Sequence, residues 1–415
     1  MTDATAPAGT TGGTTATPGR AATPGRAAMP DGAAIPEGAA IPEGAATRGG
    51  PATPGGPATP DPPVVDGVDQ LSPAWFDAVL GTVGTPAAVR AVATEPVGTG
   101  QMASTVRARL EMGDGERRTV VVKYARGDVD SPMAGMAYAK EVAFYSELGD
   151  RVAVRTPACL YAAIADDTHH FVLVLEDLAD ARQGDQIAGC AVDAAEAALV
   201  NLAGLHGPTW CDPELRSRSW LGRDPAISSE LMAPVLAMAA DAFAERFASE
   251  LDPAEAAVLD AARELLAVWM FDEGECFAVV HGDYRLDNLL FPDGDPARVA
   301  AVDWQTASAG PPARDVAYFL STCLDVDDRR RHERDLVAAY HRALCDHGVD
   351  GYTVDECLDD YRMGMLHGPL IILLGRFTAG VTDRGDEMFR VMWRRSAAAI
   401  HDLGTIDLVR DRLGR

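Results

Sequence analysis

The spacing of hydrophobic positions changes twice along the chain. Over residues 89 to 125, apolar and polar residues alternate in short, β-branched segments separated by glycine-containing turns, which predicts antiparallel strands. A helical period over residues 133–148 interrupts them, and Ser72-Pro73 has the pattern of a helix N-terminus. The strands expected in this part are 89–97, 104–112, 118–125, 158–165 and 171–175.

A helical period dominates from residue 192 onward. The helices expected there are 192–206, 230–249, 253–270, 312–323, 331–347, 354–366 and 384–403. Short strands are expected at the start of segment 279–291 and at 298–303. A strand-rich part followed by a helical part predicts an α+β fold: a small antiparallel β-sheet lobe, a larger mainly helical lobe, and a cleft between them.

Residues 1–62 have a different composition from the rest of the chain. They repeat a six-residue unit rich in Pro, Gly and Ala, such as TPGRAA and IPEGAA, with few large side chains. This composition predicts a disordered tail, and the segment lacks the basic start and apolar stretch of a secretion signal. The expected lobes are then residues 63–178 and 179–415.

Charge and cysteine content narrow the function classes. The formal net charge is −26, of which the tail supplies only −2, and this disfavours nucleic acid as a partner. The longest strongly apolar run, residues 370–374, is too short to span a membrane.

Seven scattered cysteines without a C-x-x-C pair argue against a disulfide framework or a zinc site. We expect reduced core thiols and a soluble, cytoplasmic protein.

The segment V-V-H-G-D-Y-R-L-D-N-L-L-F at 279–291 places charged and amide side chains between apolar residues. Buried polar groups need partners, so this segment must satisfy itself or hold a ligand. His281, Asp283 and Asn288 have the H-x-D-x-x-x-x-N spacing of kinase catalytic loops, in which the Asp accepts the substrate proton and the Asn binds Mg²⁺. Asp303, at the end of an apolar strand, offers a second hard ligand. Taken alone, the Asp and Asn are also ordinary turn formers.

Lys123 lies inside an expected strand and is one of only two lysines in the chain. On the next expected helix, Glu141 falls in the middle of an apolar stripe, where a carboxylate must find a cation or raise its pKa. Lys123 is the available cation, and a strand Lys paired with a helix Glu is the kinase arrangement that aims the ammonium at phosphates. Lys140 is expected on a solvated helix face, without a role.

Gly98 and Gly100 lie between the first two expected strands, in the sequence G-T-G-Q-M-A. Such a loop could arch its backbone amides over phosphates, although two glycines in a hairpin are weak evidence alone. A dinucleotide-binding loop would need a helix directly afterwards, whereas residues 104–110 alternate as a strand. We therefore favour a kinase-like glycine loop.

Together these motifs resemble the aminoglycoside phosphotransferase and choline kinase superfamily, and most closely its ecdysteroid-kinase-like branch. The motifs are the glycine loop, Lys123, E-x-x-F-Y-x-x-L from Glu141, V-L-E-D-L at 174–178, L-H at 205–206, H-G-D-Y-R-L-D-N and V-D-W-Q.

The resemblance implies a role for each matching residue. Asp283 would be the catalytic base, Asn288 and Asp303 would hold Mg²⁺, and Lys123, oriented by Glu141, would contact the phosphates of ATP. The backbone around Glu176 to Leu178 would bind adenine, and His281 would brace the loop.

The chain has no long activation segment. About a dozen residues separate Asp303 from Asp315, and no A-P-E motif follows. The expected acceptor is therefore a hydroxyl group on a small molecule, with an aminoglycoside, a choline-like amine, a steroid alcohol and a sugar all open. The alternative is a catalytically silent, nucleotide-binding regulatory module of the same fold.

Overall fold

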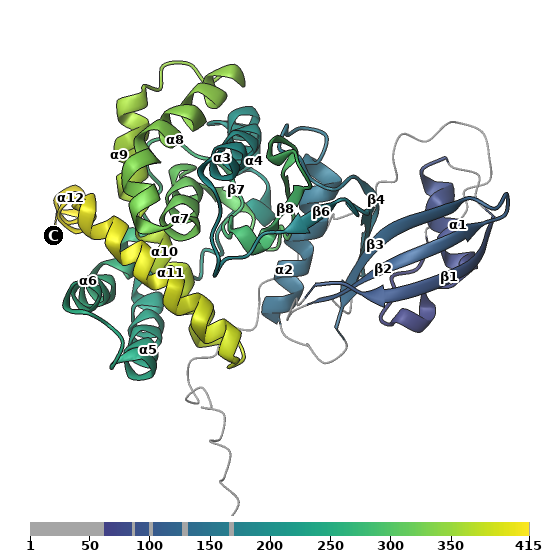
Figure 1. Ribbon diagram of the computed structural model, residues 1–415, viewed down its shortest axis with the longest axis horizontal. Helices are drawn as coiled ribbons and strands as arrows, with labels where there is room; N and C mark the ends of the chain where they lie inside the picture. Colours follow the sequence, from purple (N-terminus) through teal and green to yellow (C-terminus); the bar gives the residue numbers. More distant parts are fainter. Residues whose placement is uncertain (1–61, 85–87, 99–102, 127–131, 166–169, 415) are drawn as a thin grey trace, which may run out of the picture. The chain divides into compact units, whose positions relative to one another are not determined.

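The computed structural model describes residues 62–84, 88–98, 103–126, 132–165 and 170–414 (Figure 1). The repeat tail and Gly100 therefore lie outside the described residues, apart from Pro62 at the end of the tail. All described residues belong to one unit, which runs from Ile41 to Arg415.

The first part of this unit is a five-stranded antiparallel sheet with strand order β1-β2-β3-β5-β4. Its strands are β1 Val89–Pro96, β2 Ala103–Met112, β3 Arg117–Ala125, β4 Cys159–Ile164 and β5 Phe171–Glu176. Each bound lies within one residue of the sequence prediction. Alternation along β3 decides what each face carries: Val120 and Val122 pack in the apolar cluster that includes α1 (Pro73–Thr82), whereas Lys123 points to the opposite face.

The helix expected over 133–148 consists of two pieces. An α-helix, α2 (Pro132–Ala143), continues into a π-helical turn, Phe144–Leu148. Phe144 in that turn stacks flat on Trp304, with ring centroids 3.6 Å apart and an interplanar angle of 5°. The stack joins the strand-rich part to a segment more than 150 residues later.

The second part is mainly helical, as predicted, and confirms the α+β class. Its helices are α3 Val192–His206, α4 Pro213–Arg216, α5 Ser229–Phe247, α6 Pro253–Trp269, α7 Ala313–Cys323, α8 Val326–Asp346, α9 Val354–Gly364, α10 His367–Thr378, α11 Asp383–Asp402 and α12 Thr405–Leu413. Short 3₁₀ helices cover Val68–Gln70, Gly207–Thr209, Ser219–Leu221, Leu286–Asn288 and Pro296–Arg298.

Three helices, the single turn α4 and the longer α10 and α12, were not predicted. In α10, Gly368-Pro369 interrupts the sequence pattern, but a proline is tolerated in a first turn because its missing N–H would have no helical partner there. Before α12, Gly404 adopts the left-handed conformation (φ 60°) that ends α11, and a new helix begins directly after it.

Two small sheets bring the chemical segments together. In the first, β8 (Leu289–Pro292) lies between β6 (Ala181–Gln183) and β9 (Ala300–Ala301). In the second, β7 (Ala278–Val280) pairs with β10 (Ser308–Gly310). These pairings set the loop that follows β7 beside the loop that follows β9.

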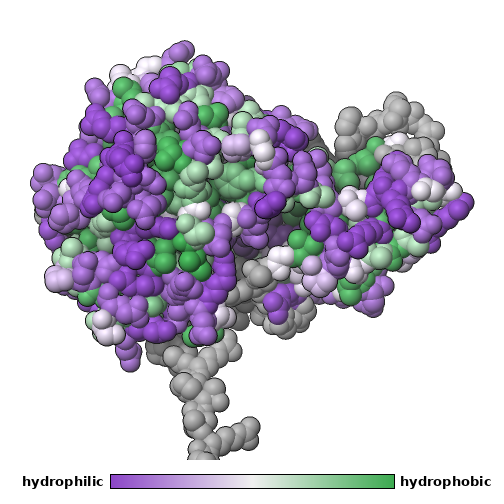
Figure 2. All heavy atoms as spheres, viewed as in Figure 1, coloured by the Kyte–Doolittle hydropathy of each residue, from purple (hydrophilic) through white to green (hydrophobic). Residues whose placement is uncertain are grey.

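The face of the molecule seen in Figure 2 is mostly hydrophilic, with apolar residues in small groups. Within the described ranges, no helix has the length and apolar character needed to cross a membrane. All seven cysteines are free. Cys323 and Cys357 are buried and three more are half-buried, but Cys211 and Cys345 are exposed, so the prediction of core thiols is wrong for these two.

Candidate active site

The loop after β7 is fixed by a buried carboxylate. Asp315, in the first turn of α7, accepts hydrogen bonds from the backbone N–H of His281 (2.6 Å) and of Gly282 (2.9 Å). Burial opposes charge on Asp315, but a contact with His206 (3.3 Å) outweighs it and lowers the pKa of the carboxyl. These contacts make Asp315 a stabiliser of the loop.

Gly282 is required by this geometry. Its φ is 81°, and a Cβ at this position would lie 2.8 Å from the carbonyl oxygen of Thr306. Its own carbonyl accepts a hydrogen bond from His367 Nε2 at 3.0 Å, so the unpredicted helix α10 also holds the loop. His281 supports the same turn: Nε2 donates to Val302 O at 3.0 Å and Nδ1 accepts from the Asp283 N–H at 3.3 Å. These contacts agree with the bracing role expected for His281.

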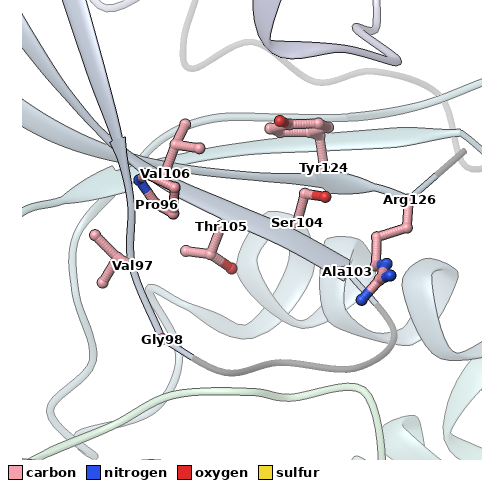
Figure 3. A pocket seen from close by; sticks show the side chains of 9 residues that line it. All are labelled: Pro96, Val97, Gly98, Ala103, Ser104, Thr105, Val106, Tyr124 and Arg126. Carbon is pink, nitrogen blue, oxygen red and sulfur yellow. The ribbon is translucent and has the colours of Figure 1, made fainter.

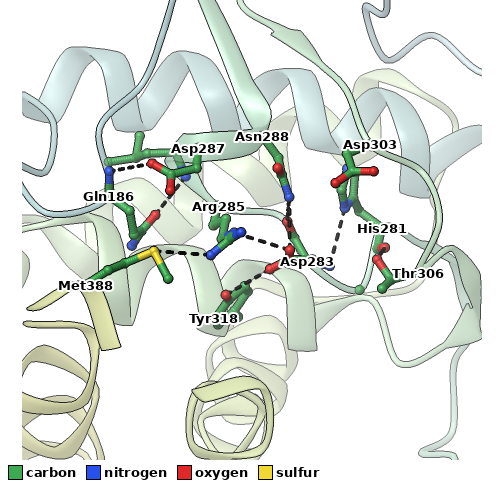
Figure 4. A network of polar contacts seen from close by, with 12 residues as sticks. Gln186, His281, Asp283, Arg285, Asp287, Asn288, Asp303, Thr306, Tyr318 and Met388 are labelled. Atoms are coloured by element: carbon green, nitrogen blue, oxygen red, sulfur yellow. Dashed lines mark hydrogen bonds and ion pairs between the residues drawn. The ribbon is translucent and has the colours of Figure 1, made fainter. Parts of the chain in front are cut away.

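The carboxylate of Asp283 is held from three sides (Figure 4). Tyr318 donates its hydroxyl to Oδ1 at 2.9 Å, and Asn288 Nδ2 donates to Oδ2 at 3.0 Å. The Nε of Arg285 lies 3.2 Å from the same Oδ2. The side chain is still 21% exposed, so a ligand can reach it. Sequence reasoning missed Tyr318, which is 35 residues away, and gave no role to Arg285, although it lies inside the motif.

Asn288 directly precedes β8 and Asp303 follows β9, and these two strands are paired. Leu289 of β8 pairs with Ala301 of β9, and the N–H of Val302 donates to the carbonyl of Asn288 at 3.0 Å. Asn288 uses its side-chain Nδ2 in hydrogen bonds to Asp283, so Oδ1 is the atom that could contact a cation.

Asp303 adopts φ 70°, a left-handed conformation that Asp tolerates better than most residues. The described residues contain no group of three His, Cys, Asp or Glu side chains suited to a metal. One amide oxygen and one carboxylate nevertheless fit Mg²⁺, which keeps water and phosphate oxygens as its other ligands.

Lys123 joins the two parts of the site. Its Nζ lies 2.7 Å from Glu141 Oε2 and 2.8 Å from Asp303 Oδ1, so the predicted Lys–Glu ion pair is confirmed and a second carboxylate completes it. Burial disfavours the ammonium, but the carboxylates of Asp303 and Glu141 outweigh it and raise the pKa of Lys123 above its ordinary value. For Asp303, burial is likewise outweighed by Lys123, and its pKa is lowered.

The prediction for Lys140 is wrong. This side chain is half-buried rather than solvated, and its Nζ donates to the carbonyl oxygen of Ala307 at 3.0 Å. Burial lowers the pKa of Lys140 to about 8. The sequence gave no signal, because the contact joins residues 167 positions apart.

The remaining predicted nucleotide contacts lie near the sheet. Gly98 adopts φ 75°, as a tight turn requires. It borders a pocket at the ends of β1, β2 and β3 (Figure 3), lined by Pro96, Val97, Gly98, Ala103, Ser104, Thr105, Val106, Tyr124 and Arg126.

The segment expected to bind adenine leaves the sheet at the end of β5. The N–H of Glu176 donates to the carbonyl of Ala158 (2.8 Å), so this donor is already used within the protein. Leu178 is buried. Between them, Asp177 is clamped by Arg107, whose Nε and Nη2 donate to its two carboxylate oxygens at 2.8 and 3.1 Å. This bidentate pair orders the segment.

The sequence profile of the ecdysteroid kinase-like family matches residues 105–349. The chain belongs to this family. The matched range contains Lys123, Glu141, the loop with Asp283 and Asn288, and Asp303, and it confirms the resemblance stated from the motifs. The family is one of kinase-like phosphotransferases related to the aminoglycoside phosphotransferases and choline kinases.

Curated relatives match only short segments. Acyl-CoA dehydrogenase family member 11 of Gallus gallus is 39% identical over 54 residues, which are 12% of this chain and 7% of that protein. The protein of the same name from Rattus norvegicus is 32% identical over 82 residues, or 17% and 10% of the two chains. The chain thus spans a tenth or less of the length of these relatives.

Several solved structures are similar at low sequence identity. An aminoglycoside 2'-phosphotransferase-IIIa solved with GDP has a TM-score of 0.48 and 15% identity, covering 78% of this chain and 98% of that one. A putative aminoglycoside phosphotransferase from Ralstonia eutropha gives 0.41 and 17%, covering 74% and 92%. The Plasmodium vivax ethanolamine kinase gives 0.44 and 12%, covering 76% and 83%.

Proposed function

We propose that this protein is an ATP- and Mg²⁺-dependent phosphotransferase that moves the γ-phosphoryl group to a hydroxyl of a small molecule. The observation that carries the proposal is the convergence of Lys123, Glu141 and Asp303 beside the loop that holds Asp283. In this proposal residues 63–178 form the nucleotide-binding lobe and residues 179–415 the catalytic and substrate-binding lobe. The free thiols fit a reducing compartment such as the cytoplasm.

Asp283 is the proposed base. Tyr318 and Asn288 donate hydrogen bonds to its carboxylate and fix its orientation. An acceptor hydroxyl bound within hydrogen-bond reach of Asp283 would be oriented for attack and would release its proton to this carboxylate.

Lys123, Asn288 and Asp303 are the proposed charge-handling residues. Bound Mg²⁺ and ATP would supply the phosphoryl group and a cation that neutralises its charge. Asn288 Oδ1 and Asp303 would hold the cation. Lys123, kept protonated by its carboxylate partners, would hold a positive charge toward the phosphates.

A small-molecule acceptor is supported by the segment after Asp303. Residues 308–310 form β10 and pair with β7, and α7 begins at Ala313. The chain between Asp303 and α7 is therefore used in strand pairing and a turn, and offers no extended surface for a peptide.

The test is an ATP-consumption screen against hydroxylated small molecules, with Mg²⁺ present or chelated. We expect Mg²⁺-dependent turnover with one chemical class and a loss of about 10²–10⁴-fold in Asp283→Ala, with nucleotide affinity retained. The control is Asp293→Ala, an exposed acid of the same region that pairs with Arg182. Nucleotide binding without turnover across the library would favour the regulatory module, and full turnover in Asp283→Ala would remove the base assignment.

A further inference from the structure

Two cysteines meet outside the site described above. Cys211 Sγ and Cys276 Sγ lie 3.0 Å apart, although 65 residues separate them in sequence. A disulfide bond is about 2.05 Å long, so a shift of roughly 1 Å would bring the sulfurs to bonding distance. Cys211 is exposed and Cys276 is half-buried, so the pair can be reached from solvent through Cys211.

The backbone around this pair is held in register. The N–H of Cys211 donates to the carbonyl of Phe277 at 2.8 Å, and the N–H of Val279 donates to Thr209 Oγ1 at 3.1 Å. These contacts flank the two cysteines and tie one segment to the other. Cys211 also has φ 49° and is, with Asp303, one of two non-glycine residues with positive φ in the described part of the chain. The sulfurs therefore face each other because the backbone is fixed.

We propose that Cys211 and Cys276 form a reversible disulfide when the protein meets a low-molecular-weight disulfide such as oxidised glutathione. The Cys211 thiolate attacks one sulfur of the oxidant, forming a mixed disulfide and releasing one small thiol. The Cys276 thiolate then attacks the Cys211 sulfur and displaces the second small thiol. Two protein thiols are oxidised to one cystine, and one small disulfide is reduced to two thiols.

The environment sets the order of these steps. Burial, contact with Cys211 and the charge of Asp360 raise the pKa of Cys276 to about 12. Cys276 is therefore a slow first nucleophile, whereas the exposed Cys211 is open to the oxidant. The part of the shift that comes from Cys211 disappears once that sulfur is in the mixed disulfide, which helps the second step.

The bond would act on the segment that leads into the candidate active site. Cys276 lies two residues before β7, and β7 leads directly into His281. A cross-link there would join the start of β7 to the segment after α3, and would raise the midpoint of thermal unfolding because it restricts the unfolded chain. The proposal does not depend on phosphotransfer.

The experiment uses the full chain, reduced, freed of reductant and then incubated with oxidised glutathione at pH 8. We expect the count of free thiols to fall from seven by at least two, non-reducing peptide mapping to give a Cys211–Cys276 cross-linked peptide, and dithiothreitol to restore all seven. The oxidised form should unfold several degrees higher than the reduced form.

Variants separate this pair from other thiols. Cys276→Ser should accumulate glutathione on Cys211, because the second step is removed, and Cys211→Ser should form neither product. Cys345→Ser, which removes the other exposed thiol, should form the cross-link as in wild type. Seven free thiols after oxidation, or cross-links that map to other cysteines, would overturn the proposal.

Discussion

The two lysines of this protein are both removed from bulk water, yet their surroundings act on them in opposite ways. Lys123 on β3 has two carboxylates within 2.8 Å, and they raise its pKa against the effect of burial. Lys140 on α2 has one backbone carbonyl as its partner, and burial lowers its pKa to about 8. The difference shows that charge on a buried lysine is set by the charge of its partners, since a carbonyl satisfies the N–H donor without offsetting the lost hydration.

The largest effect is expected from changing Asp303, the carboxylate that pairs with Lys123. Asp303→Asn takes away the proposed Mg²⁺ ligand and one partner of Lys123, and should lower kcat/KM on the order of 10³-fold. A Mg²⁺ titration of nucleotide binding should show the requirement for the metal weakened or lost. An unchanged titration would exclude Asp303 as a ligand.

Lys123→Met should lower activity by about 10²-fold or more, because the other lysine of the chain, Lys140, donates to Ala307 instead. It also leaves Glu141, only 1% exposed, without its cation, which costs about 3–5 kcal/mol if the carboxylate stays charged. The double variant Lys123→Met/Glu141→Gln should regain most of this stability in urea unfolding but none of the activity. Activity that returned with stability would show that Lys123 acts only on the fold.

Glu141→Gln leaves Lys123 with one carboxylate partner in place of two. Its surroundings then resemble more closely those of Lys140, which has a backbone carbonyl as its partner. We expect about a tenfold loss of kcat/KM, since Lys123 stays charged beside Asp303 but is less well oriented. Exposed Glu147, on the same helical segment, provides the matched control in Glu147→Gln. Equal effects of the two substitutions would contradict the orienting role.

Lys140→Met should change activity least, by less than about threefold, because Lys140 contacts a backbone carbonyl and none of the proposed site residues. The effect specific to Lys140 is on the pH dependence of the free energy of unfolding. Because the pKa of Lys140 is lower in the folded chain (about 8) than in the unfolded chain, the unfolded chain binds more protons between them, and this lysine makes stability rise with pH. Wild type should therefore gain stability relative to Lys140→Met from pH 8 to pH 10. A difference in stability between the two proteins that stays constant from pH 8 to pH 10 would contradict the lowered pKa of Lys140.

The sequence predicted helices and strands well where a regular hydrophobic pattern runs without interruption between two turns. The strands of the five-stranded sheet and α3 agree with the structure to within one residue, because alternation and glycine turns are local signals. It failed at α4, which has only four residues, and at α10 and α12, where a glycine or proline ends one pattern although a new helix begins within a few residues.

The site was predictable where chemistry forces a partner. A carboxylate on an apolar stripe needs a cation, and this led from Glu141 to Lys123. Asp315 and Tyr318 were not assigned by the sequence, since their contacts cross more than 30 residues and depend on how α7 packs. Lys140 was misplaced for the same reason, because its position on α2 does not reveal that residue 307 packs above it.

The stack of Phe144 on Trp304 has a mechanical consequence. Both rings are fully buried, and they couple the helical segment that carries Glu141 to the residue next to Asp303. Separating them would expose two large aromatic faces to water. We therefore expect that a movement of the sheet relative to the helices keeps these two rings in contact and bends the chain at other positions.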